Sequence, residues 1–455
     1  MLSAALLVAV LGLQTALSDS LPPAPQRCCD DTTRQALPSS VPAPLTRDDY
    51  RAMDRQTRSK EGWHVSPFPI LSYNSDLGFQ IGAFAEIYDY GKNPGIFPDY
   101  RHRFHAEGSY FTRGMFAADV EYDSEYLIPG TRLSASATWL HDPLYAFYGF
   151  NGCEPYDEGR DRRNGTAYYS MQRDMLRILV AVQGKIGGGF QYIAGIAAWH
   201  YAMDELHFEK FKDSPTLYAD YRQAGLIRDD ETQGWVTEGK AGISYDTRDF
   251  EPSPTRGIAA ETYLIGAPDF SGKGYGYLKL AAHWRHYLTP GPAWLTLAYH
   301  LAYQGTLAGA PPFYIQSGIA ALTLKQPTSE GLGGVNTLRG ILGGRLVGDG
   351  VAWGNFEIRM RLWEWEIADH SFYFGINPFF DIGCVVQPYR LQEQAAYKQV
   401  AVSDLRREAC RPHMSAGLGF KGGLDENFIL SIEAGKAFRK DDGPLGLFIS
   451  LNYIF

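Results

Sequence analysis

Apolar and polar residues alternate one by one along most of the chain, from about residue 65 to the end. The last segment, 444–455, is the clearest, because every second residue from Leu445 to Phe455 is apolar or aromatic and falls on one face of an extended strand. A period of two is typical of a β-strand with one apolar face. No helical pattern separates these segments, so the sequence predicts an all-β fold.

The opposite face of several segments is charged. In 351–366, the residues between the apolar positions are Asn355, Glu357, Arg359 and Arg361. A sandwich core does not hold such a row, whereas a sheet facing water or the hydrated lumen of a barrel does. Aromatic residues concentrate near segment ends, as they do at the two interfaces of a membrane barrel. They include Trp139, Tyr145, Phe147, Tyr148, Trp363, Trp365 and Tyr373.

These patterns favour a transmembrane antiparallel β-barrel, because a sheet in lipid must close on itself to satisfy its backbone hydrogen bonds. The alternating segments predict sixteen strands, and an even number places both termini in the periplasm. The strands are expected near 65–73, 78–90, 102–112, 115–127, 131–142, 170–186, 190–206, 234–250, 256–267, 275–289, 294–309, 351–366, 372–385, 413–424, 428–438 and 444–455.

The connections between these segments alternate in length. Long ones are expected near 143–169, 207–233, 310–350 and 386–412, and short turns such as 290–293 separate them. Short periplasmic turns and long external loops are typical of outer-membrane barrels. The first two hairpins fit this alternation least well.

The N-terminal part of the chain differs from the rest. Residues 1–18 form one apolar run that predicts a secretory signal peptide, although it contains no Lys or Arg; a buried core helix is the alternative. Residues 19–62, rich in Pro, Ser, Asp and Arg, predict a short periplasmic arm that is partly disordered and contains one short helix. These 44 residues are too few for a domain with its own core, so the barrel is expected to span 63–455.

Composition and motifs disfavour several classes of protein. The chain has 42 Lys and Arg against 51 Asp and Glu, with no basic cluster, which argues against nucleic-acid binding. Beyond residue 18 no apolar run is long enough for a helical membrane span. There is no G-x-S-x-G elbow, no P-loop and no His pair with metal-ligand spacing, so we expect no enzyme activity, no cofactor and no metal.

Four patches resemble the barrel of the BamA/TamA superfamily of outer-membrane assembly factors, also called bacterial surface antigens. The resemblance covers roughly 234–455 and extends more weakly from residue 65. The terminal strand, with Tyr453 and Phe455, is similar to the recognition signal of outer-membrane barrels. The other patches are GISYDTRDFEPSPTRG (242–257), GGVNTLRGILGG (333–344) with GDGVAWGNFEIRMRL (348–362), and PFFDIG (378–383).

The resemblance implies a role for Arg339 and Gly340. In the family, this loop folds into the barrel and its arginine meets acidic groups on the inner wall. The alternation puts Glu357 and Asp381 on the lumen face, so a guanidinium between these two carboxylates would fix the loop. The alternative is a solvated external arginine. Ile341 stands where the family usually has an aromatic residue.

The resemblance also implies a location and a function. A Gram-negative outer-membrane protein that inserts or translocates other proteins is expected, with outer-membrane lipid around it and outer-membrane proteins or lipoproteins as clients. A weak seam between the first and last strands would admit the client. Family members that assemble proteins carry periplasmic POTRA repeats, and the 44-residue arm cannot hold one, so the chain resembles the subgroup without them.

Lacking such repeats, the protein is expected to need a separate periplasmic or surface partner. A gated pore, or a translocation or docking barrel dedicated to one partner, is the alternative function.

The five cysteines give one candidate disulfide. Cys384 and Cys410 bracket the expected loop 386–412, at the outer ends of adjacent strands, so a bond between them would close that loop. Cys28 and Cys29 are neighbours, which would strain a bond between them, and Cys153 has no obvious partner.

Overall fold

In the computed structural model, the barrel belongs to one compact unit of the chain, Leu45–Phe455. The expected signal peptide (1–18), nearly all of the expected arm, and Cys28, Cys29, Cys153 and Cys410 lie outside the described residues. The structure describes residues 61–74, 77–92, 100–152, 154, 156–161, 166–207, 211, 214–250, 253–319, 329–367, 370–389, 411–424 and 428–455.

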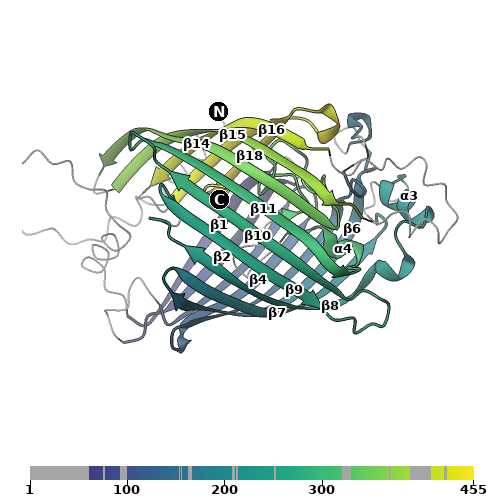
Figure 1. Cartoon of the computed structure of the whole chain (residues 1–455), viewed down its shortest axis with the longest axis horizontal. Coiled ribbons are helices and arrows are strands. Elements are labelled where there is room, and N and C mark those ends of the chain that lie inside the picture. The colour runs from purple at the N-terminus through teal and green to yellow at the C-terminus, as the bar shows by residue number, and fades with distance from the viewer. Residues whose placement is uncertain are drawn as a thin grey trace, which may run out of the picture. The chain divides into compact units, whose positions relative to one another are not determined.

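Sixteen antiparallel strands close into a barrel, in which each strand pairs with its neighbours in the sequence and β1 pairs with β18 (Figure 1). The predicted fold is confirmed. No helix in the described part of the chain is long and apolar enough to cross a membrane. The barrel strands are β1 (Trp63–Asn74), β2 (Gly78–Asp89), β3 (His102–Phe111), β4 (Phe116–Ile128), β5 (Thr131–Ala146), β6 (Ser170–Gly187), β7 (Phe190–Asp204), β8 (Gln233–Asp246), β9 (Gly257–Ala267), β10 (Tyr277–Leu288), β11 (Leu295–Gly309), β14 (Gly350–Ile367), β15 (His370–Gln387), β16 (His413–Leu424), β17 (Phe428–Ala437) and β18 (Gly446–Leu451).

The two faces of the wall follow the alternation in the sequence. In β14, Phe356 and Ile358 are 41% and 44% exposed, whereas Asn355 and Glu357 are 0% and 3% exposed. The apolar face is therefore the outer surface, where lipid takes the place of a protein core, and the charged face lines the lumen.

The aromatic girdle is only partly where the sequence suggested. Trp139, Trp363 and Trp365 are exposed on the outer surface, but Phe147, Tyr148 and Tyr373 are buried. Tyr373 packs in the lumen under the guanidinium of Arg361, at 4.6 Å. Phe147 and Tyr148 belong to the loops, where burial against other aromatic rings takes them away from the lipid interface.

The long loops share one end of the barrel. Successive connections in an antiparallel barrel alternate between its two ends, and an odd number of other connections separates each long loop from the next. Figure 1 shows α3 (Leu217–Gln223) and α4 (Phe313–Gln316) at this end. The short connections between β1 and β2 and between β3 and β4 lead to the same end, which explains why the first two hairpins fit the length pattern poorly. The remaining elements there are η1 (Glu158–Arg160), η3 (Asp229–Glu231), η5 (Lys440–Asp442) and the small sheet of β12 (Gly318–Ile319) and β13 (Ser329–Glu330).

Buried aromatic residues join the long loops to one another. The rings of Phe147 and Tyr221 meet edge to face at 5.4 Å, and those of Phe150 and Tyr389 lie 4.5 Å apart. We call this group the lid cluster. Its members are Phe147, Tyr148, Phe150, Tyr156, Tyr169, Tyr218, Tyr221, Phe313, Tyr314 and Tyr389.

The junction between β1 and β18, here called the seam, is the shortest in the barrel. Only Tyr73 with Ile449 and Asn74 with Phe448 are paired across it. On its other side, β1 is paired with β2 along its whole length, from Trp63 with Asp89 to Asn74 with Gly78. Most of the seam edge of β1 therefore carries no strand partner among the described residues.

Two prolines in β1 account for the short seam. Tyr90 N donates to Gly62 O at 3.0 Å, so even-numbered residues of β1 bond to β2 and odd-numbered N–H groups point to the seam. Pro67 and Pro69 are odd-numbered and have no N–H to donate. Continuing the register of Tyr73 with Ile449 would bring Tyr453 opposite Pro69 and Phe455 opposite Pro67.

The chain leaves the wall just before that point. The strand expected over 444–455 ends at Leu451, and Asn452 has a φ of 67°, which turns the backbone out of an extended path. The last residues, 452–455, form a tail that enters the lumen. The sequence prediction for these residues was wrong because alternation within the strand says nothing of the missing donors on the opposing strand.

Candidate functional site: a buried charge cluster beside the seam

The loop that carries the arginine-glycine pair folds into the lumen; we call residues 331–349 the inner loop. Its two arms are joined by Leu332 and Leu346, whose backbones exchange hydrogen bonds of 2.8 and 3.0 Å. Leu338 and Ile341 at its tip are 0% and 1% exposed. Ile341 therefore fills an apolar cluster together with Trp353.

Arg339 is fully buried and binds Asp381 with two parallel hydrogen bonds. Its Nε donates to Oδ2 at 3.0 Å and its Nη2 donates to Oδ1 at 2.9 Å. The backbone N–H of Arg339 also donates to Oδ2, at 2.9 Å. This fork geometry is the strongest form of arginine-carboxylate pairing, and it fixes both the side chain and the backbone of the loop tip.

Two further acidic residues surround the same guanidinium. Nη1 donates to Glu357 Oε1 and, at 3.0 Å, to Glu433 Oε1. The ring of Phe379 lies below the guanidinium, 3.7 Å from its carbon. Burial alone would lower the pKa of Arg339, but Asp381, Glu357 and Glu433 outweigh it and raise that pKa well above its ordinary value.

Sequence reasoning missed Glu433. The only signal was its place as a lone carboxylate in the otherwise apolar and small segment FILSIEAGKA of β17. Its side chain contacts Arg339, 94 residues away in the sequence, and this distance hides the pairing from any local pattern.

The charges in this region balance. Arg359 Nε donates to Glu357 Oε2 at 2.7 Å, and Lys421 Nζ donates to Glu433 Oε1 at 3.0 Å. With Arg339, these make three cations, and they face three carboxylates. Buried charges are tolerated when each has a partner of opposite sign. We call the six residues the charge cluster: Arg339, Arg359, Lys421, Glu357, Asp381 and Glu433.

Gly340 places the inner loop directly against β17. Its φ is 88°, and its carbonyl oxygen accepts a hydrogen bond of 3.0 Å from the N–H of Ala437. A Cβ atom on Gly340 would lie 2.4 Å from the carbonyl carbon of Gly435. The loop tip is therefore held by β14, β15 and β17, next to the strand that forms the seam.

The tail reaches the same cluster from the other side. The guanidinium carbon of Arg359 lies 4.0 Å from the ring centre of Tyr453, and its Nη2 donates to the backbone oxygen of Phe455 at 2.7 Å. The structure thus brings Arg339, Gly340, Glu357, Asp381, Tyr453 and Phe455 into one region of the lumen.

Two other candidate features stay apart from this region. Cys384 lies in β15 and is partly buried, but Cys410 is outside the described residues, so the disulfide between them stays a prediction. Peptide mapping under non-reducing conditions would test it. Among the residues that the structure describes, no group of three or more His, Cys, Asp or Glu could hold a metal ion.

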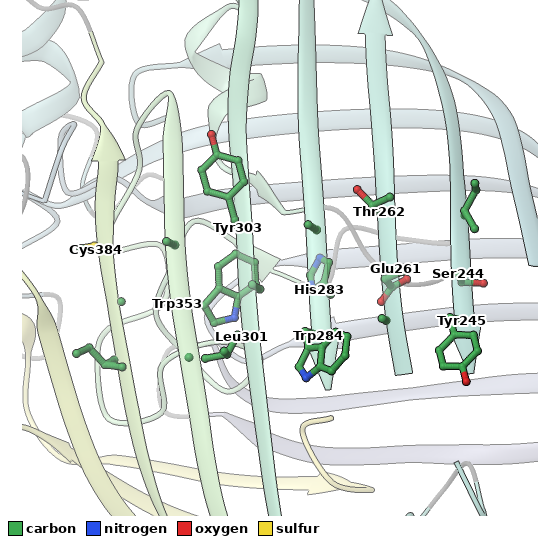
Figure 2. Close-up of a pocket in the computed structure, with 18 of the residues that line it drawn as sticks. Ser244, Tyr245, Glu261, Thr262, His283, Trp284, Leu301, Tyr303, Trp353 and Cys384 are labelled. Carbon is green, nitrogen blue, oxygen red and sulfur yellow. The ribbon is translucent and has the colours of Figure 1, made fainter. Parts of the chain in front are cut away.

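An apolar groove of about 830 Å³ runs along the wall of β8–β15 (Figure 2). The exposed side chains Ile243, Trp284 and Leu301 stand beside the small residues Ala260 and Ala282. Large and small residues side by side leave such a groove on the outward-facing apolar surface of a barrel.

Comparisons with known proteins concern the fold. No family model and no curated protein sequence matches the chain. The structure of BamA from Haemophilus ducreyi lacking POTRA domains 1–3 is similar, with a TM-score of 0.56, 13% identity, and coverage of 87% of this chain and 71% of that one. CdiB from Escherichia coli gives a TM-score of 0.54 and 9% identity, covering 87% of this chain and 64% of CdiB.

These similarities show the architecture. The protein has the fold of a BamA-type sixteen-stranded outer-membrane barrel. It spans less than two thirds of the CdiB chain.

Proposed function

We propose that this barrel acts at the outer membrane in the insertion or translocation of proteins, and that it does so by opening the seam. The observation that carries the proposal is the seam itself, in which only two residue pairs join β1 to β18. An unpaired strand edge offers N–H and C=O groups to an incoming strand. The sequence resemblance to assembly factors adds support.

The charge cluster would keep the rest of the barrel in shape while the seam opens. Its members lie on β14, β15, β16 and β17 and on the inner loop, and none lies on β1 or β18. The strands on one side of the seam are thereby tied together through Arg339. Opening would then be confined to the junction that has the fewest hydrogen bonds.

The clients would be outer-membrane proteins or lipoproteins, and outer-membrane lipid would surround the wall. A separate periplasmic or surface partner would deliver or receive them. We assign no catalytic role and no cofactor to the barrel.

A reversible lock across the seam tests this function. Ser72 and Ser450 are next in register after Tyr73 and Ile449, so the double variant Ser72→Cys/Ser450→Cys places two thiols across it. The matched control, Ser72→Cys/Gln80→Cys, joins β1 to β2 at an existing pair. Both are made in a background without the native cysteines.

The seam lock is expected to lower the amount of folded outer-membrane proteins in cells, measured by heat-modifiable gel mobility, and a reductant should restore it. The control lock should leave that amount unchanged. Normal assembly in cells whose protein is fully cross-linked at the seam would contradict the proposal.

One observation favours the alternative, a gated pore or a docking barrel without insertase activity. Pro67 and Pro69 remove two N–H donors from the middle of the seam edge, so a client strand would form an incomplete ladder there. A pore predicts steady conductance in planar bilayers. An insertion barrel predicts little conductance, because the lid cluster packs the loops together at one end.

A further inference from the structure

One lysine lies on the outer face of the barrel wall. Alternation places the other lysines and arginines of the described barrel strands on the inner face, as it does Arg285 and Lys421, which are buried in the lumen. Lys436 of β17 instead shares the outer face with Ile432 and is exposed. A cation on the lipid-facing wall is costly at the middle of the membrane and is tolerated near an interface.

The length of β17 places Lys436 at such an interface. The strand runs from Phe428, which follows a short turn, to Ala437, which leads to the end of the barrel that carries the long loops. Its ten residues are about the number that a tilted strand needs to cross the hydrocarbon core. Lys436 is the last but one of them, and long loops are external in outer-membrane barrels, so its ammonium group lies at the outer leaflet.

The wall beside Lys436 offers no opposite charge. Its partner in β16 is Ala416. On the other side, continuing the register of Gly435 with Gly446 brings Leu445 opposite Lys436. Both neighbours are apolar, so the counter-charge of this lysine has to come from the surroundings of the barrel.

Two more cations follow at the external end of the wall. Arg439 and Lys440 are exposed where the chain leaves β17 and enters η5. Asp441 is exposed beside them, whereas Asp442 is buried and its Oδ1 lies 2.7 Å from Nδ1 of His413. Three exposed cations therefore stand against one exposed carboxylate, and the surface is positive.

The inner loop fixes the turn that carries these cations. Arg345 Nε donates to the carbonyl oxygen of Asp441 at 3.2 Å, and Leu342 N donates to that of Asp442 at 3.1 Å. A backbone held in this way loses less conformational entropy when its side chains bind a ligand.

Apolar side chains on the same outer face lie next to the cations. Phe438 is 60% exposed, and its ring lies 6.1 Å from that of Phe380. Leu445 and Leu447 of the next strand are 59% and 41% exposed. Cations at the edge of an apolar and aromatic surface match a lipid that carries phosphate groups on its head and acyl chains below them. Lipopolysaccharide, with phosphates on its lipid A, is such a lipid in the outer leaflet of Gram-negative outer membranes.

We propose that Lys436, Arg439 and Lys440 bind the lipid A phosphates of lipopolysaccharide, with Phe438 packed against its acyl chains. The bound lipid lies on the outer side of β17, whose inner side bonds to Gly340 of the inner loop, and one strand away from the seam. This inference rests on the outer-membrane location and does not depend on the proposed insertion function.

Titration of the full-length protein in detergent with fluorescently labelled lipopolysaccharide tests the site. The triple variant Lys436→Gln/Arg439→Gln/Lys440→Gln is expected to bind on the order of tenfold more weakly than the unsubstituted protein, because each cation near an anionic membrane surface contributes severalfold to binding. The three side chains are exposed, so the variant should keep its heat-modifiable gel mobility.

The matched control removes three other exposed cations and so changes the net charge equally. It is Lys92→Gln/Lys185→Gln/Lys273→Gln, and its affinity should equal that of the unsubstituted protein. Equal affinity of the two triple variants would overturn the site, since binding would then follow net charge alone.

A second ligand tests the chemistry without any substitution. Lipopolysaccharide whose lipid A phosphates have been removed should bind the unsubstituted protein about tenfold more weakly than the intact lipid. Equal binding of the two forms would overturn a phosphate site. Competition by phosphatidylglycerol that is as effective as competition by unlabelled lipopolysaccharide would overturn the assignment to lipopolysaccharide.

Discussion

Gly340 of the inner loop and Gly435 of β17 meet backbone to backbone. A Cβ atom on Gly340 would lie 2.4 Å from the carbonyl carbon of Gly435, and one on Gly435 would lie 2.9 Å from that of Arg339. Because Arg339 immediately precedes Gly340, this contact also fixes the point at which the guanidinium enters the charge cluster. The arginine needs the glycine beside it for a steric reason, and a second glycine on the opposing strand completes the fit.

Gly340→Ala is therefore expected to lower the free energy of unfolding by about 3 kcal/mol, through the positive φ and the overlap with backbone atoms. The midpoint of urea unfolding in detergent measures this. Gly422→Ala is the matched control, because a Cβ atom on that strand glycine would meet no atom within 4 Å. An equal effect of the two substitutions would show that the contact with Gly435 is not tight.

Arg339→Ala should leave export intact and destabilise the barrel. Three buried carboxylates would lose their shared cation, and removal of one partner from a buried charge network costs about 3–5 kcal/mol. The readouts are the urea midpoint and heat-modifiable gel mobility. Arg339→Lys should recover only part of the loss, since an ammonium group cannot form the two parallel bonds to Asp381.

A surface arginine gives the control for that experiment. Arg228 also contacts a carboxylate through two nitrogens, at 3.0 and 2.9 Å from the oxygens of Asp230, but its side chain is 43% exposed. Arg228→Ala is expected to change the free energy of unfolding by less than about 1 kcal/mol. An unchanged urea midpoint and unchanged heat-modifiable gel mobility in Arg339→Ala would contradict the stabilising role of the charge cluster.

The long loops that the lid cluster joins are expected to become less stable as the pH rises. Burial raises the pKa of Glu231 above its ordinary value of 4.5, although the backbone N–H of Arg228 donates to it at 3.1 Å. A raised pKa in the folded state means that the fold favours the protonated form. This contribution is complete below the unfolded-state pKa and disappears as the pH passes the raised folded-state value.

Hydrogen exchange of the backbone around η3 should therefore be slower in mildly acidic buffer than at neutral pH, after correction for the intrinsic exchange rate. Glu231→Gln removes the titrating group and should abolish the difference. A pH dependence that persists in Glu231→Gln would assign it to another group.

The sequence predicts some parts of this site and not others, for identifiable reasons. Glu357 and Asp381 were found because a strand alternates strictly, so one apolar neighbour fixes the face of each. Glu433 lies on an equally regular strand, but its partner Arg339 comes from a distant segment, and alternation carries no information about which segments meet.

Two errors have the same origin. Phe147 and Tyr148 follow a strand end, which suits an interfacial girdle, yet packing against other loops buries them. Tyr453 and Phe455 continue the alternation of β18, yet the opposing strand cannot pair with them. In both cases, the deciding contacts were made by residues far away in the sequence, and tertiary context overrode the local pattern.

The prolines of β1 provide the last prediction. Pro67→Val/Pro69→Val restores two N–H donors on the seam edge, opposite Phe455 and Tyr453 in the continued register. Pairing of 452–455 with β1 would then compete with the contacts of the tail to Arg359, and two new backbone hydrogen bonds would stabilise the barrel by about 1–3 kcal/mol.

Hydrogen exchange at residues 63–72 and 452–455 measures the pairing, and the double variant should be protected at both. The single variants Pro67→Val and Pro69→Val are the controls, and each should give about half of the stabilisation, because the two donors lie on separate residue pairs. Exchange that is as fast in the double variant as in the parent protein would mean that the contacts with Arg359, rather than the prolines, keep the tail out of the wall.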